Sequence, residues 1–319
     1  MAVLVKGAAV AGLAVAHELM VRGIEVTVVD PAPGGLRAAS WYAGGMLAPY
    51  CERESAEQAV VELGRAAADW WEEALPGSVT RNGTLVLAPA RDHKELDRFG
   101  ARTSGFEMVD EGGIAALEPD LSGRFRKGLH FPSEAHLDPR HALVGLAAKL
   151  AASGVSFETD LSAPSDFEWT IECVGRATQD ENIRGVRGEM LLLRTPDVAL
   201  SRPIRLIHPR FPVYIVPRAG QTFMVGATMI ESDATGPITA RSMMELLNAA
   251  YSLHPAFGEA EIVETGTGIR PAYADNLPRV VRNGNAISIN GLFRHGFLLA
   301  PAMALQAADM IFDERNKAQ

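Results

Sequence analysis

Two side chains in the second half of the chain have the chemistry needed to bind a small carboxylate. Arg270 lies among glycine and proline residues in the segment Gly266-Thr267-Gly268-Ile269-Arg270-Pro271, which favours a fixed guanidinium fork suited to bidentate binding. Tyr214 begins the run Tyr214-Ile215-Val216-Pro217-Arg218, and its hydroxyl, on the same strand face as Val216, can donate to a carboxylate. The plainer alternatives are a surface ion pair for Arg270 and a core position for Tyr214.

A glycine-containing turn near the N-terminus has the features of a dinucleotide site. The segment Gly7-Ala8-Ala9-Val10-Ala11-Gly12 lies between an expected strand over 2–5 and an expected helix over 10–22. Gly7 and Gly12 suit the tight turn and the close helix packing of that site, and the helix N-terminus suits a pyrophosphate. Ala9 replaces the middle glycine, and its methyl group predicts weaker phosphate binding. Asp30 stands near the ~20-residue spacing of the ribose-binding acid. A turn without a ligand is the alternative.

Two further segments carry small residues at places where a backbone could approach a ligand. Gly44 and Gly45 precede Met46 in the run 40–49, where an ordinary glycine loop is the alternative. In the run 290–301, a glycine-flanked turn containing His295 leads into a helix whose N-terminus can face a negative group. His295 has no cysteine or acidic residue at ligand spacing, so neither a metal site nor a catalytic triad is predicted.

The elements that would position these residues fall into two patterns. Strands expected over 2–5, 25–29, 155–158, 170–174 and 286–290, with helices over 10–22, 139–153 and 300–315, indicate a parallel sheet. Strands over 84–88, 188–194, 214–218 and 222–228 read as antiparallel, and a long helix is expected over 55–73. The sequence therefore predicts an α/β protein with a Rossmann-like cofactor domain over 1–78, 136–185 and 262–319. An antiparallel β-rich substrate domain, over 79–135 and 186–261, would be inserted into it.

Composition excludes several classes of protein. The formal net charge is −9, and the basic cluster from Arg202 to Arg210 is broken by prolines and is expected to be a solvated loop, so nucleic acid is not an expected partner. No stretch reaches the ~18–20 apolar residues of a membrane helix. Cys51 and Cys173 fit no metal or disulfide spacing, which indicates free thiols in a reducing cytoplasm, with Cys173 buried.

Taken in order, these segments resemble the D-amino-acid oxidase superfamily, and within it the glycine oxidases, including the thiamine-pathway form. The resemblance rests on the turn from Gly7 to Gly12 with Asp30, on the run 43–47, on the strand 214–218, and on the turn 268–271. The run 293–301, Phe-Arg-His-Gly-Phe-Leu-Leu-Ala-Pro, completes it. The resemblance extends from about Val3 to Ile311.

This resemblance implies noncovalently bound FAD and a particular set of site residues. Arg270 would clamp the substrate carboxylate, Tyr214 would donate a second hydrogen bond to it, Met46 would lie near the flavin, and Arg294 would lie at the substrate end. The implied cofactor-binding residues are Gly7, Ala9, Val10, Ala11, Gly12, Asp30, Ala39, Ser40, Ala43, Gly44, Gly45, Met46, Val174, Gly175, Arg270, Gly291, Arg294, His295, Gly296, Phe297 and Leu298.

The resemblance also implies a reaction and partners. Glycine, sarcosine or a small D-amino acid would be oxidised to its imine, O2 would be reduced to H2O2, and the imine of glycine would pass to a thiazole synthase in thiamine biosynthesis. A cytoplasmic homo-oligomer is expected. Two alternatives stay open: an amino-acid dehydrogenase that uses a quinone or a carrier protein, and a flavin-binding protein without turnover, for which Ala9 is the main support.

Overall fold

One parallel sheet forms the half of the molecule that contains both termini. A computed structural model describes the whole chain except residues 33–37, 90–91, 161–166, 208–212 and 318–319. The six strands run in the order β17 (Arg279–Asn283), β18 (Ala286–Asn290), β10 (Trp169–Glu172), β1 (Ala2–Lys6), β2 (Glu25–Val29) and β9 (Ser156–Glu158). Only the β17–β18 pair is antiparallel. Val3, Leu4 and Val5 of the central strand β1 point to alternate faces and are all buried, as expected for a strand covered on both faces.

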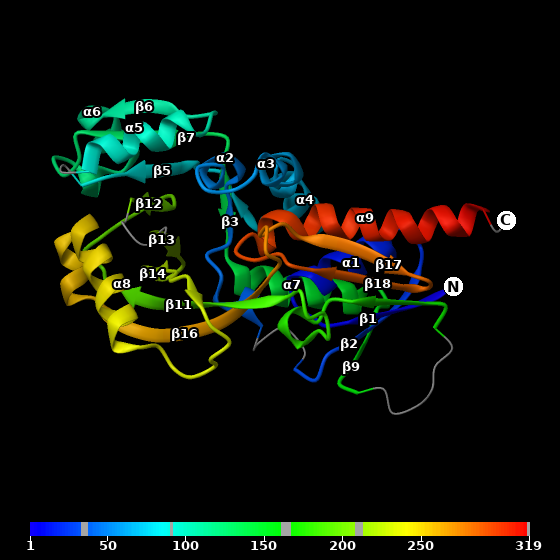
Figure 1. The fold of residues 1–319 in the computed structure, drawn as a ribbon. Helices are drawn as coiled ribbons and strands as arrows, with labels where there is room; N and C mark the ends of the chain where they lie inside the picture. The colour runs from blue at the N-terminus through cyan, green and yellow to red at the C-terminus, as the bar shows by residue number, and fades with distance from the viewer. Residues whose placement is uncertain (33–37, 90–91, 161–166, 208–212, 318–319) are drawn as a thin grey trace.

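Three apolar helices pack against this sheet and against one another. They are α1 (Val10–Val21), α7 (Pro139–Ala152) and α9 (Gly296–Lys317). Nearly every residue of α1 is buried, because its sequence is apolar on all sides and neighbours cover it. Helix α9 begins at Gly296, four residues before the expected start, and runs along the sheet toward the end that carries both termini (Figure 1).

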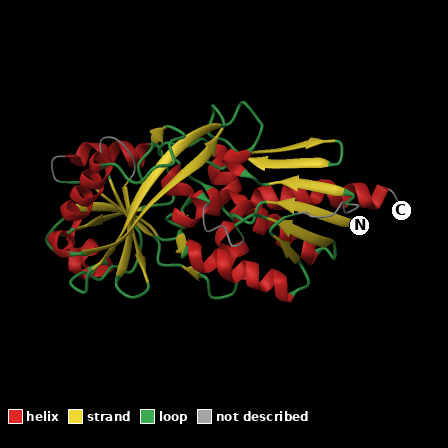
Figure 2. Cartoon of the chain, turned by 90° about the horizontal axis from the view of Figure 1, so that it is seen from below, coloured by secondary structure: helices red, strands yellow, loops and turns green. Residues whose placement is uncertain are grey.

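The second, nine-stranded sheet is largely antiparallel. Its order is β15 (Ile230–Glu231), β11 (Arg184–Arg194), β14 (Thr222–Gly226), β13 (Val213–Arg218), β12 (Ile204–Leu206), β5 (Thr84–Leu87), β7 (Lys127–Phe131) and β6 (Glu107–Asp110), and β16 (Glu261–Ala272) pairs with β11. Helix α8 (Ala240–Leu253) covers one face of it through Leu246, Ala250 and Leu253. Figure 2 shows the first sheet fanned out near both termini and the second gathered at the other end.

The longest strand lies across one of the expected domain boundaries. Strand β16 begins at the boundary expected between 261 and 262, and it pairs antiparallel with β11 from Glu261 to Ala272. The segment 262–272 is thus part of the second sheet, although it leads directly into residues of the first. The division of the chain into a cofactor domain and a substrate domain stays a prediction.

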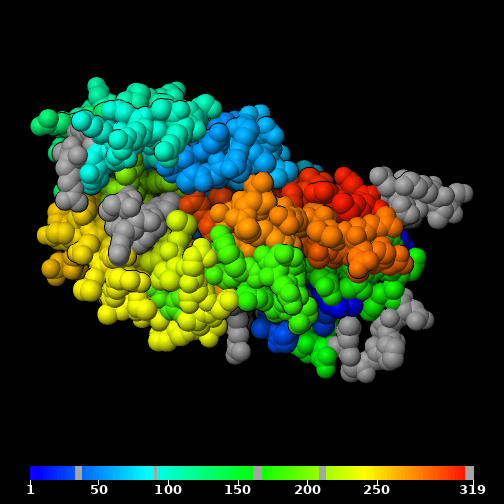
Figure 3. All heavy atoms as spheres, in the orientation of Figure 1, coloured from blue at the N-terminus to red at the C-terminus, as the bar shows by residue number. Residues whose placement is uncertain are grey.

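The segment that links the two sheets differs from the expected single helix. Residues 55–73 contain two helices, α3 (Gln58–Gly64) and α4 (Ala67–Ala74). Gly64 ends α3 where a Cβ atom would lie 2.7 Å from the Leu298 side chain, so close packing on α9 requires glycine at a position where it weakens the helix. Figure 3 shows this light-blue segment packed between the cyan segment of β5–β7 and the red helix α9.

The remaining elements are short. They are α2 (Pro49–Glu52), α5 (His93–Ala101), α6 (Glu111–Leu117), a small sheet of β3 (Met46–Leu47), β8 (Ala135–Leu137) and β4 (Val79–Thr80), and the 3-10 helices η1 (Ala39–Tyr42), η3 (Pro119–Leu121), η4 (Gly175–Ala177) and η5 (Pro255–Glu259). In the part of the chain that the structure describes, no helix is both long enough and apolar enough to cross a membrane.

Candidate active site

A cavity of about 1340 Å³ runs from the N-terminus of α1 to the second sheet. Its walls come from both sheets, since Gly7 and Asp30 follow β1 and β2, whereas Tyr214 and Arg270 lie on β13 and β16. Pockets for small ligands usually hold roughly 300–1000 Å³. This cavity is therefore large enough for a dinucleotide together with a small substrate.

The turn between β1 and α1 is built around two glycines. Gly7 has a φ of +101°, and a Cβ atom there would lie 2.5 Å from the carbonyl oxygen of Cys173. A Cβ atom on Gly12 would lie 1.8 Å from the carbonyl oxygen of Gly7. The Asp30 carboxylate accepts hydrogen bonds from the amides of Ala8 at 2.7 Å and Ala32 at 2.8 Å. Both glycines are thus required for packing, and Asp30 ties the turn to the end of β2.

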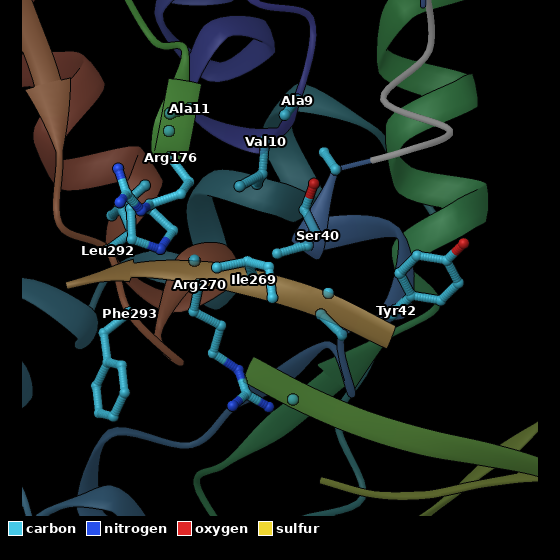
Figure 4. A pocket seen from close by; sticks show the side chains of 18 of the residues that line it. Ala9, Val10, Ala11, Ser40, Tyr42, Arg176, Ile269, Arg270, Leu292 and Phe293 are labelled. Carbon is cyan, nitrogen blue, oxygen red and sulfur yellow. The ribbon is translucent and has the colours of Figure 1, made fainter. Parts of the chain in front are cut away.

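The N-terminus of α1 can receive an anion. Ala9 is the N-cap residue, and no side chain caps the helix, so the first N–H groups of α1 have no such partner. Ala9, Val10 and Ala11 line the cavity (Figure 4). Ala9 has φ −87° and ψ −173°, an extended conformation that does not require glycine. The site thus fits the pyrophosphate of a dinucleotide, and the expected weakening by the Ala9 methyl group stays a prediction.

The structure brings nearly all of the predicted site residues to this one cavity. Those that line it are Gly7, Ala9, Val10, Ala11, Asp30, Ala39, Ser40, Ala43, Gly44, Gly45, Met46, Val174, Gly175, Tyr214, Arg270, Arg294, His295, Gly296, Phe297 and Leu298. Gly12 and Gly291 do not line it. Gly291 has a φ of +76°, and a Cβ atom there would lie 2.3 Å from the Tyr273 ring. Like Gly12, it shapes the surrounding backbone.

Arg270 extends from β16 toward β11 at the end of the cavity away from α1 (Figure 4). Its Nη1 donates to the carbonyl oxygen of Thr228 at 3.0 Å, and no carboxylate among the described residues forms an ion pair with it. A Cβ atom on Gly188 would lie 2.2 Å from Nη2 of Arg270, so glycine at 188 makes room for the guanidinium. Burial and the nearby charge of Arg294 lower the pKa of Arg270 to about 10. The group therefore stays a cation at neutral pH.

Glu52 is the central acid of this end of the cavity, and the sequence analysis missed it. It is a buried residue at the end of α2. Its carboxylate lies 2.6 Å from Nη2 of Arg294 and 2.9 Å from Nε2 of His295, and it accepts a hydrogen bond from the Tyr214 hydroxyl. Burial raises the pKa of Glu52, but Arg294 and His295 outweigh it, and the net pKa lies well below the usual range. Glu52 is therefore an anion.

The expectation that His295 has no acidic partner is wrong. Glu52 precedes it by 243 residues, so no local spacing in the sequence could have revealed the pair. Burial lowers the pKa of His295 more than Glu52 raises it, which leaves a neutral imidazole whose Nε2 lies 2.9 Å from the Glu52 carboxylate and 3.2 Å from Nε of Arg294. Its Nδ1 has no hydrogen-bond partner among the described residues.

The expectation of a solvated basic loop from Arg202 to Arg210 is also wrong for its first part. Arg205 is buried on β12, where it donates to the Tyr214 oxygen at 2.9 Å and pairs with Glu54 at 2.9 Å. Arg202 pairs with the buried Glu118 at 2.8 Å. The sequence did not show these partners because they lie far away along the chain. The stretch 208–212 lies outside the described residues.

Several other cavity-lining residues were not predicted. Beyond Glu52 and Gly188 they include Arg176, Met190, Met224 and Met229. Arg176 directly follows the predicted Gly175, so its position in the sequence could have suggested that it lines the cavity. The three methionines carry no motif. No group of three or more histidine, cysteine or acidic side chains that could hold a metal ion occurs among the residues that the structure places. The Cys51 and Cys173 thiols are buried and unpaired.

Comparisons with known proteins agree with this site. Residues 2–310 match the family described as FAD dependent oxidoreductase. The chain is 59% identical over 325 residues to a candidate thiamine biosynthesis oxidoreductase, ThiO, of Rhizobium etli, which covers 99% of this chain and 98% of that relative. It is 27% identical over 347 residues to the bifunctional protein ThiO/ThiG of a Nostoc species, which covers 98% of this chain and 53% of that protein.

A solved structure has the same fold. Glycine oxidase from Geobacillus kaustophilus matches this structure with a TM-score of 0.81 at 23% identity, over 98% of this chain and 94% of that one. The family match spans both sheets and every residue of the cavity described above. The chain therefore belongs to the FAD-dependent oxidoreductases of the D-amino-acid oxidase type, and FAD is its cofactor.

Proposed function

We propose that this enzyme oxidises the carbon–nitrogen bond of glycine, sarcosine or a small D-amino acid to the imine, with O2 reduced to H2O2. The observation that carries the proposal is Arg270, a cation that faces the cavity with no carboxylate partner among the described residues. A guanidinium held in that way suits the carboxylate of an amino acid. The names of the relatives, a thiamine biosynthesis oxidoreductase and a glycine oxidase, agree with this substrate class.

The surroundings of Arg270 favour a small substrate. Met46, Met190 and Met224 line the same cavity, and Met190 and Met224 are buried against Val216. These side chains present apolar surface to the cavity, which is a poor surrounding for a charged or strongly polar substituent. The role of the protein would be to fix the substrate by its carboxylate and to exclude water, because orientation is the main contribution that this site can make.

The cofactor carries the redox chemistry. When bound, FAD supplies the two-electron oxidation. We propose that Gly7, Ala9, Val10, Ala11 and Asp30 hold its pyrophosphate and ribose. The other predicted residues would contact the flavin and the adenosine half: Ala39, Ser40, Ala43, Gly44, Gly45, Met46, Val174, Gly175, Arg270, Arg294, His295, Gly296, Phe297 and Leu298. The packing glycines Gly12 and Gly291 would support that site indirectly.

Tyr214 can donate to a substrate carboxylate, as expected, only if its hydroxyl gives up its present hydrogen bond. Its hydroxyl has one proton, which it donates to Glu52, while its oxygen accepts from Arg205. It can donate to a substrate carboxylate only by turning away from Glu52. Arg270 would therefore be the principal carboxylate ligand, with Tyr214 second.

The test is peroxide release by the FAD-loaded protein with glycine, sarcosine, D-alanine and D-proline. Arg270→Ala should abolish turnover of these substrates while FAD stays bound, because Arg270 is the one arginine or lysine among the described residues lining the cavity that has no carboxylate partner. Arg270→Lys is the matched control: it keeps the charge but loses the fork, so we expect a raised KM with residual activity. Full activity of Arg270→Ala would contradict the carboxylate clamp.

The same experiment separates the alternatives. Reduction of an artificial dye without peroxide would favour a dehydrogenase that uses a quinone or a carrier protein. Bound flavin that no amino acid reduces would favour a binding protein without turnover.

We also propose that the imine passes to a thiazole synthase, which would consume it in thiamine biosynthesis. The bifunctional ThiO/ThiG relative, of which this chain matches about half, supports such a pairing. Adding a thiazole synthase with its other substrates should convert glycine to thiazole only when this enzyme is active. The homo-oligomeric state and the cytoplasmic location stay predictions.

A further inference from the structure

The carboxylate of Glu52 occupies a set of donors that resembles a binding site for a ligand carboxylate. A guanidinium, a phenol hydroxyl and an imidazole nitrogen converge on it, from Arg294, Tyr214 and His295. All four residues line the cavity that contains Arg270. A ligand carboxylate that entered this end of the cavity would have to take its hydrogen bonds from the same three residues.

The charges at this end of the cavity leave one cation for a substrate. Arg294 is committed to Glu52 at 2.6 Å and to the Ser55 hydroxyl at 2.7 Å. Arg205 is committed to Glu54 at 2.9 Å. Among the residues that the structure describes, Arg270 has only a carbonyl partner, Thr228. A substrate with one carboxylate would balance Arg270, whereas a second carboxylate would meet the Glu52 anion.

We propose that Glu52 is an internal carboxylate that occupies the place of a second substrate carboxylate and so restricts the enzyme to monocarboxylic substrates. This inference rests on the proposed role of Arg270 as the carboxylate clamp. Glu52 acts through Arg294 and Tyr214, so it is a positioning residue that determines specificity. The buried Glu52 anion keeps its place because Arg294 compensates its charge, and separating the two would leave that charge unpaired.

The unmodified enzyme should already prefer ligands with a single carboxylate. FAD-loaded protein should bind acetate, a single carboxylate, at least about tenfold more tightly than malonate, which carries two. Perturbation of the flavin absorption spectrum during titration reports this binding without any turnover. Malonate binding as tight as acetate binding would overturn the proposal with no variant needed.

Glu52→Gln provides the decisive variant because glutamine keeps the size of the side chain and removes its charge. We expect the ratio of malonate to acetate affinity to rise at least about tenfold, since Arg294 becomes free for the second carboxylate. The ratio of kcat/KM for iminodiacetate to that for sarcosine should rise in the same direction. A loss of folding alone cannot produce a gain in affinity. An unchanged ratio in a folded variant would overturn the proposal.

Two matched variants complete the experiment. Glu54→Gln makes the same change two residues away, in a side chain that pairs with Arg205 and does not line this cavity, and should leave both ratios as in the unmodified enzyme. Glu52→Asp keeps the charge and should retain the preference for monocarboxylates. If the unmodified enzyme oxidises no amino acid but Glu52→Gln gains affinity for malonate, the proposed function fails and this inference stands. If glycine is oxidised but Glu52→Gln leaves the ratio of malonate to acetate affinity unchanged, the proposed function stands and this inference fails.

Discussion

Glu134 is a buried carboxyl group next to α2. Its Oε1 accepts the backbone N–H of Cys51 at 2.7 Å, and its Oε2 has no hydrogen-bond partner among the described residues. Burial raises its pKa from 4.5 to about 8, an effect that the Cys51 amide only partly opposes. The folded protein therefore binds a proton that the unfolded chain releases between those two pH values.

This proton predicts how stability depends on pH. Because the folded state holds more protons between pH 4.5 and about 8, the contribution of Glu134 to the free energy of unfolding is full below that window and falls as pH rises through it. The loss is on the order of a few kcal/mol. Glu134→Gln should remove this slope and unfold at a higher urea concentration than the unmodified protein at pH 8. Parallel pH profiles for the two proteins would show that Glu134 titrates normally.

The residues that the sequence could not reveal are the ones whose partners are distant in the chain. Arg270 and Tyr214 were singled out by their immediate neighbours and both line the cavity. Glu52 and Arg205 have no local signature, because their importance comes from ion pairs and hydrogen bonds formed only after folding. Gly188 was missed for a related reason, since the guanidinium that it accommodates belongs to another strand.

Among the elements of the fold, the turn before α1 contains one position that must be glycine and another that accepts a side chain. Gly12 cannot gain a Cβ atom without a clash with Gly7, whereas Ala9 already carries one in an extended conformation. The central strand β1 was easy to predict because burial on both faces makes it a continuous apolar run. The break between α3 and α4 was not, since it depends on contact between Gly64 and Leu298.

The residue at position 9, at the N-terminus of α1, should affect the affinity for FAD. Ala9→Gly should lower the dissociation constant of FAD, because the backbone could then approach the pyrophosphate more closely. Fluorescence titration of the apoprotein with FAD measures this directly. Gly12→Ala is the contrasting variant and should lose FAD binding or folded protein altogether. An unchanged or weaker affinity in Ala9→Gly would show that the Ala9 methyl group does not limit binding.

At the scale of the whole molecule, the cavity lies where the two sheets meet. Gly7 and Asp30 belong to one side, and Gly188 and Arg270 to the other. Alternating helices and strands were enough to predict the parallel sheet, but the place of β16 beside β11 in the second sheet depends on the pairing of strands far apart in sequence. The α/β class was therefore predictable, and the shared wall of the cavity was not.

A ligand that touches both sheets should stabilise them together. FAD at about one hundred times its dissociation constant should add roughly 2.7 kcal/mol to the free energy of unfolding. Calorimetry should then show one transition that moves to higher temperature with FAD concentration. Two transitions, of which FAD shifts only one, would show that the cofactor is held by one sheet alone.

Helix α9 starts at the cavity with Gly296 and continues to Lys317, a rigid rod about 33 Å long at 1.5 Å per residue. Its far end lies beside the N-terminus (Figure 1). A second catalytic domain joined at that end would begin a helix length away from the cavity. A flexible tether there would give each active site an effective concentration on the order of millimolar with respect to the other. It would not align the openings of the two sites. An intermediate shared between such domains would travel through solvent, and its lifetime in water would set the yield.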